Sequence, residues 1–207
     1  MSTFSRIALV CFLVLPCCVF LIDSGQEDEI IFGPDSPEYA SFRNHRHVFA
    51  SLANADQVMI YEGLPHQNQE HQVYKQEVAS SSISYLFQFP FYRNAIQTND
   101  PDRKRLTWLF RSSETFQPWK GPKACGGFHP DYCLQWKTKT GDEVSCLVCF
   151  GCGEVKLYWT DGSLRCDIAK SAEPELCNLL LGFQKNRPLT PHFKQLIEWA
   201  HDNRPPE

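Results

Sequence analysis

The chain has 207 residues, a formal net charge of −4, a hydrophobic fraction of 43% and an aromatic fraction of 13%. This composition excludes an intrinsically disordered protein, and the length accommodates one ordinary domain with a leader and short tails. The acidic balance, without any long basic run, excludes electrostatic recognition of nucleic acid or of an anionic membrane surface.

An uncharged apolar run covers residues 7–22. Arg6 precedes it and Asp23 follows it, a polarity that keeps the N-terminus inside and sends the rest of the chain across a membrane. The run is longer than a typical signal-peptide core and shorter than a typical spanning helix, so residues 1–24 are predicted to be a signal peptide or an N-terminal membrane anchor. The protein is therefore expected to be periplasmic, secreted or anchored by one helix, with no other membrane contact.

An acidic stretch with several Gly and Pro residues follows at 25–44 and is predicted to be a flexible linker. The body, residues 45–203, is predicted to be a single α+β Cys-rich domain, followed by a tail at 204–207. A body of this size is expected to bury roughly 70% of its unfolded surface, so it needs no cross-links in order to fold.

The first half of the body contains helix and strand patterns in alternation. Apolar residues at helical spacing predict a helix within 47–55, and the β-branched and aromatic run 57–61 predicts a strand. Residues 66–82 are polar and predict helix or loop. Residues 83–92 are β-rich, and Pro90 confines them to an edge or a bulge.

A helix is predicted to begin after Asn99, because Asn is a good capping residue and Pro101 fits the first turn. It should end near Ser112. One face of this helix is apolar and consists of Leu106, Leu109 and Phe110.

Residues 131–168 show the clearest organisation. Apolar and polar residues alternate with the period of half-buried strands, and turn sequences at 138–142, 151–153 and 160–163 separate four such runs. Helical patterns follow at 174–184 and 190–201. The sequence therefore predicts an α+β fold, with an antiparallel four- to five-stranded meander sheet and helices packed on one face.

The cysteines are unevenly distributed. Three of the ten lie in the leader, none lies between residues 23 and 124, and seven lie in the C-terminal half of the body. Outside the cytoplasm these thiols are expected to pair or to bind metal, and an odd number leaves one over. The seven are Cys125, Cys133, Cys146, Cys149, Cys152, Cys166 and Cys177.

The segment from Cys146 to Gly153 is the strongest candidate for chemistry. Cys149 and Cys152 are separated by two residues and followed by Gly153, a pattern similar to the metal knuckles of zinc ribbons and rubredoxins. A structural Zn site would use Cys146, Cys149 and Cys152 with Cys133, or draw partners from Cys125 and His129. Disulfides are the alternative, with Cys133 opposite Cys149 across the hairpin if its loop spans residues 139–142.

Two further alternatives concern catalysis. The Cys-x-x-Cys-x-x-Cys segment can serve a thiol- or metal-dependent redox protein, although a strand pattern follows it, where thioredoxin-like chemistry uses a helix. Cys125, His129 and Asp131 are the second group, since they can provide a nucleophile, a base and an orienting carboxylate for a Cys/His hydrolase. The competing interpretation is a tight Gly126-Gly127 loop at the entrance to the sheet.

Three stretches carry a resemblance. They are the run from Ala55 to His66, the run from Cys125 to Cys133, and Cys149-Phe-Gly-Cys152. They resemble a group of uncharacterised exported bacterial proteins of the kind found in planctomycete-like genomes. The resemblance implies export and a shared domain, and no activity. The sequence therefore favours a non-enzymatic exported or tethered domain that disulfides or a structural metal stabilise.

Overall fold

A computed structural model describes residues 36–203, apart from the side chains of Glu38 and His45. The predicted leader at 1–24, most of the predicted linker and the tail at 204–207 lie outside the described residues. Within residues 36–203 the fold is α+β, as predicted, with a seven-stranded antiparallel sheet and a separate two-stranded sheet. No helix in this range is both long and apolar enough to cross a membrane.

The strand order of the large sheet is β4-β1-β6-β7-β8-β9-β5. Its strands are β1 (Ala55–Glu62), β4 (Ile96–Gln97), β5 (Phe116–Pro118), β6 (Tyr132–Thr138), β7 (Glu143–Cys149), β8 (Glu154–Trp159) and β9 (Gly162–Ile168). The small sheet is a hairpin of β2 (Ile83–Leu86) and β3 (Phe89–Tyr92). The helices are α1 (Pro37–Ser51), α2 (His71–Ser80), α3 (Asp100–Arg111), α4 (Glu173–Leu181) and α5 (Pro191–Asp202), with a 3₁₀ turn, η1 (Leu52–Asn54), after α1.

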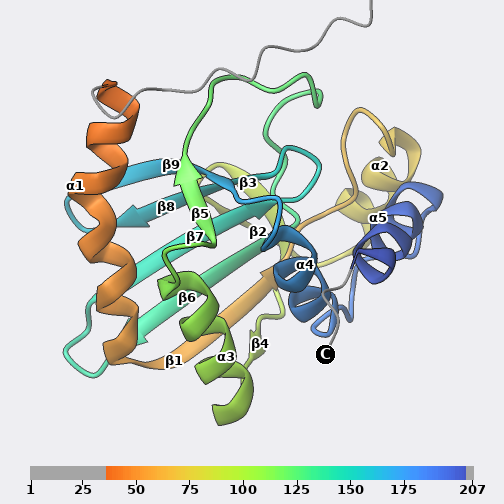
Figure 1. Ribbon diagram of the computed structural model, residues 1–207. Helices are drawn as coiled ribbons and strands as arrows, with labels where there is room; N and C mark the ends of the chain where they lie inside the picture. Colours follow the sequence, from red (N-terminus) through yellow and green to blue (C-terminus); the bar gives the residue numbers. More distant parts are fainter. Residues whose placement is uncertain (1–35, 204–207) are drawn as a thin grey trace, which may run out of the picture. The chain divides into compact units, whose positions relative to one another are not determined.

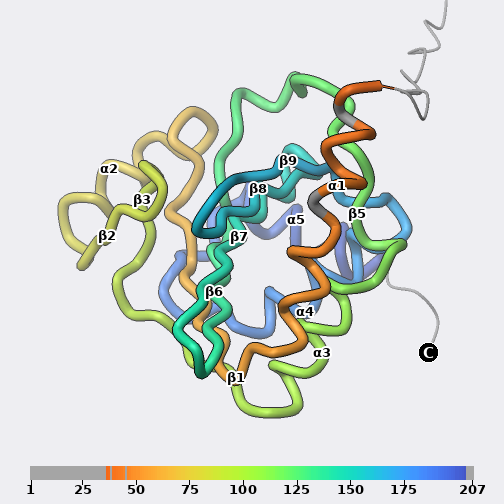
Figure 2. The backbone as a smooth tube through the Cα atoms, turned by 90° about the vertical axis from the view of Figure 1, so that its left-hand side faces the viewer, coloured from red at the N-terminus to blue at the C-terminus, as the bar shows by residue number. Residues whose placement is uncertain are grey.

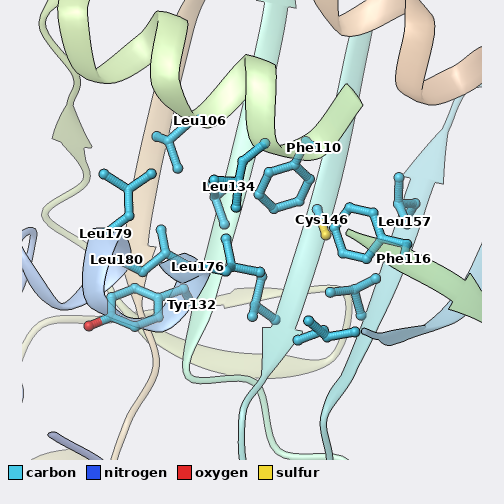
Figure 3. Packing of buried hydrophobic residues seen from close by; sticks show 14 of the residues in the cluster. Leu106, Phe110, Phe116, Tyr132, Leu134, Cys146, Leu157, Leu176, Leu179 and Leu180 are labelled. Carbon is cyan, nitrogen blue, oxygen red and sulfur yellow. The ribbon is translucent and has the colours of Figure 1, made fainter. Parts of the chain in front are cut away.

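The two faces of the large sheet are covered differently. Helices α1, α3 and α4 lie on one face, and the β2–β3 hairpin lies on the other (Figures 1 and 2). The main core is on the helical side, where α3 and α4 pack over the central strands (Figure 3). Each fully buried Leu or Phe there contributes about 1.5–3 kcal/mol to folding. Its labelled members include Leu106, Phe110, Leu134, Cys146, Leu157, Leu176 and Leu180.

The predicted helix after Asn99 is confirmed. The Asn99 side chain accepts a hydrogen bond from the Asp102 backbone N–H at 2.8 Å, and α3 ends at Arg111. Its predicted apolar face is the buried one, formed by Leu106, Leu109 and Phe110.

The predicted four-strand meander is also confirmed, as β6 to β9, but the sheet is wider than the four or five strands expected. β1 pairs with β6, β4 lies outside β1, and β5 lies outside β9. β4 has two residues and β5 has three, too few to show a period of two in the sequence.

Helix α1 begins at Pro37, inside the 25–44 range predicted as linker. The Ser36 hydroxyl accepts a hydrogen bond from the Tyr39 backbone N–H at 3.1 Å, and Pro37 occupies the first turn. This is the Ser-Pro start that favours a helix N-terminus. Phe42, Val48 and Phe49 then place its apolar side against the sheet.

The β-rich stretch 83–92 forms a hairpin, with Phe87 and Gln88 at φ values of 52° and 70° in its turn. Neither residue is a glycine, so the sequence carries no hairpin signal there. Phe91 is fully buried against the second face of the sheet, and the Phe87 ring stacks on Tyr158 with centroids 4.1 Å apart. Pro90 lies in this two-stranded sheet, in which both strands are edge strands, as predicted.

Candidate functional site

Three of the segments singled out in the sequence meet at one end of the large sheet, where β1 ends, β6 begins and β7 turns into β8. A disulfide joins Cys125, in the loop before β6, to Cys152, in the β7–β8 turn, with their Cα atoms 5.6 Å apart. The loop needs its glycines because Gly126 and Gly127 adopt φ values of 82° and 101°, the left-handed region that side chains disfavour.

The same loop is attached to the sheet by polar contacts. Trp119 donates its indole N–H to the fully buried Glu154 carboxylate at 2.8 Å, and the Lys123 ammonium lies 2.9 Å from Asp167. Arg165 also pairs with Glu154, at 2.6 Å. The disulfide therefore closes a loop whose first part is already held by β8 and β9.

Arg187 lies at the centre of the site. Its side chain is 3% exposed, and its guanidinium pairs with the Asp131 carboxylate at 2.6 Å and the Glu70 carboxylate at 3.1 Å. The guanidinium also lies 4.2 Å from the Phe193 ring centroid, a cation–π contact. Two carboxylates thus share one cation that is almost completely buried.

The two carboxylates have further donors. Asp131 accepts the Phe150 backbone N–H at 2.9 Å, while Glu70 accepts the His66 backbone N–H at 2.6 Å and the Thr190 hydroxyl. Burial alone would raise the pKa of Glu70, but these hydrogen bonds and the charge of Arg187 outweigh it and lower that pKa. Glu70 therefore stays ionised.

Glu62, at the end of β1, holds the segment that carries Arg187. Its carboxylate accepts the backbone N–H groups of Lys185 and Asn186 at 2.8 and 2.7 Å and the Asn186 side-chain amide at 2.6 Å. Glu62 is 2% exposed. Three N–H donors from two consecutive residues converge on this one carboxylate, so the contact fixes the backbone between α4 and α5.

Three imidazoles lie beside this ion-pair cluster. The rings of His66 and His129 are 4.7 Å apart, and those of His66 and His192 are 6.3 Å apart, between centroids. The His66 Nδ1 accepts the backbone N–H groups of Asn68 and Gln69 at 3.2 and 3.3 Å. Its proton is therefore on Nε2, in the neutral form of the ring.

Comparison with protein-family models, curated proteins and solved structures finds no match to this chain.

Burial, reinforced by Arg187 and His66, lowers the pKa of His129 from 6.5 to about 4. An unfolded chain takes up this proton near pH 6.5 and the folded chain near pH 4, so stability is complete above 6.5 and declines as pH falls towards 4. We expect a loss of about 2–3 kcal/mol over this window from His129. Urea denaturation at pH 7.5, 5.5 and 4.5 measures it.

In that titration, His129→Gln should flatten the pH dependence between 7.5 and 4.5. Some slope should remain because burial also lowers the pKa of His66. His71→Gln, at an exposed position, is the matched control and should keep the wild-type slope. An unchanged slope in His129→Gln would contradict the assignment.

The hydrolase candidates Cys125, His129 and Asp131 do lie at one end of the sheet, in other roles. Cys125 is bonded to Cys152 and offers no thiol. Asp131 pairs with Arg187 and caps the Phe150 amide, so its carboxylate orients the loop between α4 and α5. This arrangement holds chain segments together.

The four metal candidates do not converge on one point, although Cys149 and Cys152 share the β7–β8 turn. Cys152 is in the disulfide; Cys133 packs under the β2–β3 hairpin, while Cys146 faces the main core on the other side of the sheet. The β6–β7 loop does span residues 139–142, but Lys137 pairs with Glu143, and this register places Cys133 opposite Leu147 and not opposite Cys149. Among residues 36–203, no group of three or more His, Cys, Asp or Glu side chains is arranged to hold a metal ion.

The remaining body cysteines are buried thiols. Burial raises the pKa of the Cys149 thiol to about 12, and it raises the pKa of Cys133, Cys146, Cys166 and Cys177 further. A thiol reacts as its thiolate, so at neutral pH these groups behave as small apolar side chains.

Sequence reasoning missed Glu62, Glu70 and Arg187, because isolated charged residues belong to no recognisable motif. Gly63 did offer a signal. A Cβ at this position would lie 2.0 Å from the Pro130 carbonyl oxygen, and the Gly63 N–H donates to the Asp131 carbonyl at 2.7 Å. A glycine between a strand and a Leu-Pro turn can mark such a close backbone approach.

Proposed function

We propose that the chain is an exported or membrane-tethered, non-enzymatic domain. At its Cys-rich end, a disulfide and buried ion pairs hold the loops together. The observation that carries the proposal is the Cys125–Cys152 disulfide, which joins the loop before β6 to the β7–β8 turn beside the buried Arg187 cluster. Disulfides form and persist in oxidising compartments. The charge change across the apolar run, from Arg6 to Asp23, supports the same location.

The contacts of the site support a structural role. The Asp131, Glu70 and Glu62 carboxylates receive donors from Arg187 and from backbone amides. Groups bonded in this way orient loops and have little freedom to exchange protons with a substrate.

The main alternative is a metal- or thiol-dependent redox protein that uses the segment with Cys146, Cys149 and Cys152, in which Cys149 and Cys152 would form the redox pair. The two residues share one turn, but a redox pair needs an accessible thiolate, and Cys149 is 2% exposed with its pKa raised to about 12. A structural disulfide and a catalytic one also differ in reduction potential, so the two functions can be separated by measurement.

In the test, the purified chain is equilibrated with a glutathione buffer at a redox potential of about −200 mV. At this potential catalytic disulfides exchange with glutathione and structural disulfides remain oxidised. Peptide mapping of the alkylated protein should recover Cys125 linked to Cys152, with Cys149 as a thiol. A Cys149–Cys152 peptide, or a half-reduced pair at this potential, would favour the redox alternative.

Export is tested separately by fusing an alkaline phosphatase, which is active only outside the cytoplasm, after Glu207. Cells should show phosphatase activity, and deletion of residues 1–24 should abolish it. Equal activity with and without these residues would refute the proposed location.

A further inference from the structure

A second feature lies at the opposite end of the strands from the disulfide. Here β1 begins, β6 and β8 end, and the C-terminal part of α1 passes over the turns of two hairpins. These elements surround a pocket of about 440 Å³. Pockets that bind small organic molecules typically measure about 300–1,000 Å³.

Part of the lining of this pocket is apolar and aromatic. Trp136 and Trp159 contribute from the ends of β6 and β8, and Val48, Leu52 and Val144 add aliphatic surface. Trp136 is 1% exposed and belongs to the main core, so this wall rests on a rigid layer. Indole rings favour stacked or edge-on contact with other aromatic rings.

The position of Trp159 depends on Gly162, its partner across the β8–β9 turn. A Cβ on Gly162 would lie 2.7 Å from the Trp159 ring, so the indole lies directly against the β9 backbone. The glycine therefore allows one wall of the pocket to be a tryptophan ring.

Charges around the pocket determine which molecules fit. Lys139 is opposed by Asp142 and Asp161, while the Glu143 carboxylate is already paired with Lys137 at 3.2 Å. The sum of these Lys, Asp and Glu charges is negative, and this negative charge disfavours an anionic ligand.

We propose that this pocket binds a small, neutral aromatic molecule, which contacts the partly exposed Trp159 indole above the buried Trp136. The aromatic lining provides the attraction, and the acidic rim selects against anions. The site shares no residue with the disulfide end, so the inference is independent of the proposed function.

The experiment uses two fluorescent probes with the same ring system. N-phenyl-1-naphthylamine is neutral, and 8-anilino-1-naphthalenesulfonate adds a sulfonate. We expect the neutral probe to bind the full chain and the anionic probe to bind several-fold more weakly. Equal or tighter binding of the anionic probe would overturn the selectivity.

Two pairs of variants locate the binding. Ser51→Trp places a large side chain in the pocket from an exposed position of α1, and it should weaken binding of the neutral probe about tenfold or more. Asn44→Trp makes the same addition at another exposed position of α1, outside this pocket, and should bind like the wild type. Equal binding by these two variants would overturn the proposal.

Trp159→Ala removes one aromatic wall without filling the pocket, and it keeps the test valid if Ser51→Trp fails to fold. It should weaken binding by several-fold to about tenfold. Trp108→Ala, which removes a 63% exposed indole on α3, is its control and should bind like the wild type. Wild-type affinity in Trp159→Ala would also count against the site.

Discussion

Arg187→Met is expected to destabilise the folded chain by about 3–5 kcal/mol, because it leaves two buried carboxylates without their cation. Asp131 and Glu70 pair with Arg187 at 2.6 and 3.1 Å, and all three side chains are shielded from water. Methionine keeps much of the length of the side chain and its contact with Phe193, so lost packing contributes little. The free energy of unfolding, from urea denaturation at pH 7.5, measures the effect.

The matched control is Arg105→Met. Arg105 pairs with Glu175 at 3.7 Å, and its side chain is 60% exposed. An exposed pair contributes about 0–1 kcal/mol, so this variant should unfold almost like the wild type. If both variants lose the same stability, the buried cluster is no stronger than a surface ion pair and its structural role is refuted.

The double variant Cys125→Ser/Cys152→Ser should lose about 3–4 kcal/mol of unfolding free energy. The disulfide closes a loop of sequence separation 27, and removing it increases the conformational freedom of the unfolded chain. Replacing both cysteines avoids a single unpaired thiol at the site. Urea denaturation without reductant, compared with the wild type, gives the difference.

Reductant provides the internal control for this variant. Adding tris(2-carboxyethyl)phosphine should lower the stability of the wild type towards that of the double variant and leave the double variant unchanged. Reductant sensitivity in the double variant would show that another cysteine pair stabilises the fold.

Local patterns in the sequence predicted the local parts of the fold. The start of α3 is decided by Asn99 and Pro101, and the four strands β6 to β9 by alternation and turn sequences. The attachment of β1 to β6 was not predictable, because Tyr61 and Cys133 are distant in sequence and no local rule pairs them. The β2–β3 turn could not be predicted, because Phe87 and Gln88 are not residues that typically form turns.

The candidate site could likewise be predicted only in the parts that local sequence patterns decide. Sequence reasoning selected Cys125, Cys152 and Asp131, which do lie at the site, but it could not choose among the possible cysteine pairings. It missed Arg187, because burial of a lone arginine depends on where two distant carboxylates lie after folding. Cysteine spacing alone also could not show that Cys133 and Cys146 face opposite sides of the sheet.

The contact between Glu62 and residues 185–187 has a consequence for the order of folding. It joins positions 123 to 125 residues apart, so the end of β1 gains these partners only after the whole intervening chain has been synthesised. Contacts of such long range slow folding, since the chain must close a large loop before it gains their energy. A chain that lacks residues 185–187 leaves the Glu62 carboxylate at the end of β1 without these backbone donors, so this end of the sheet is completed late in folding.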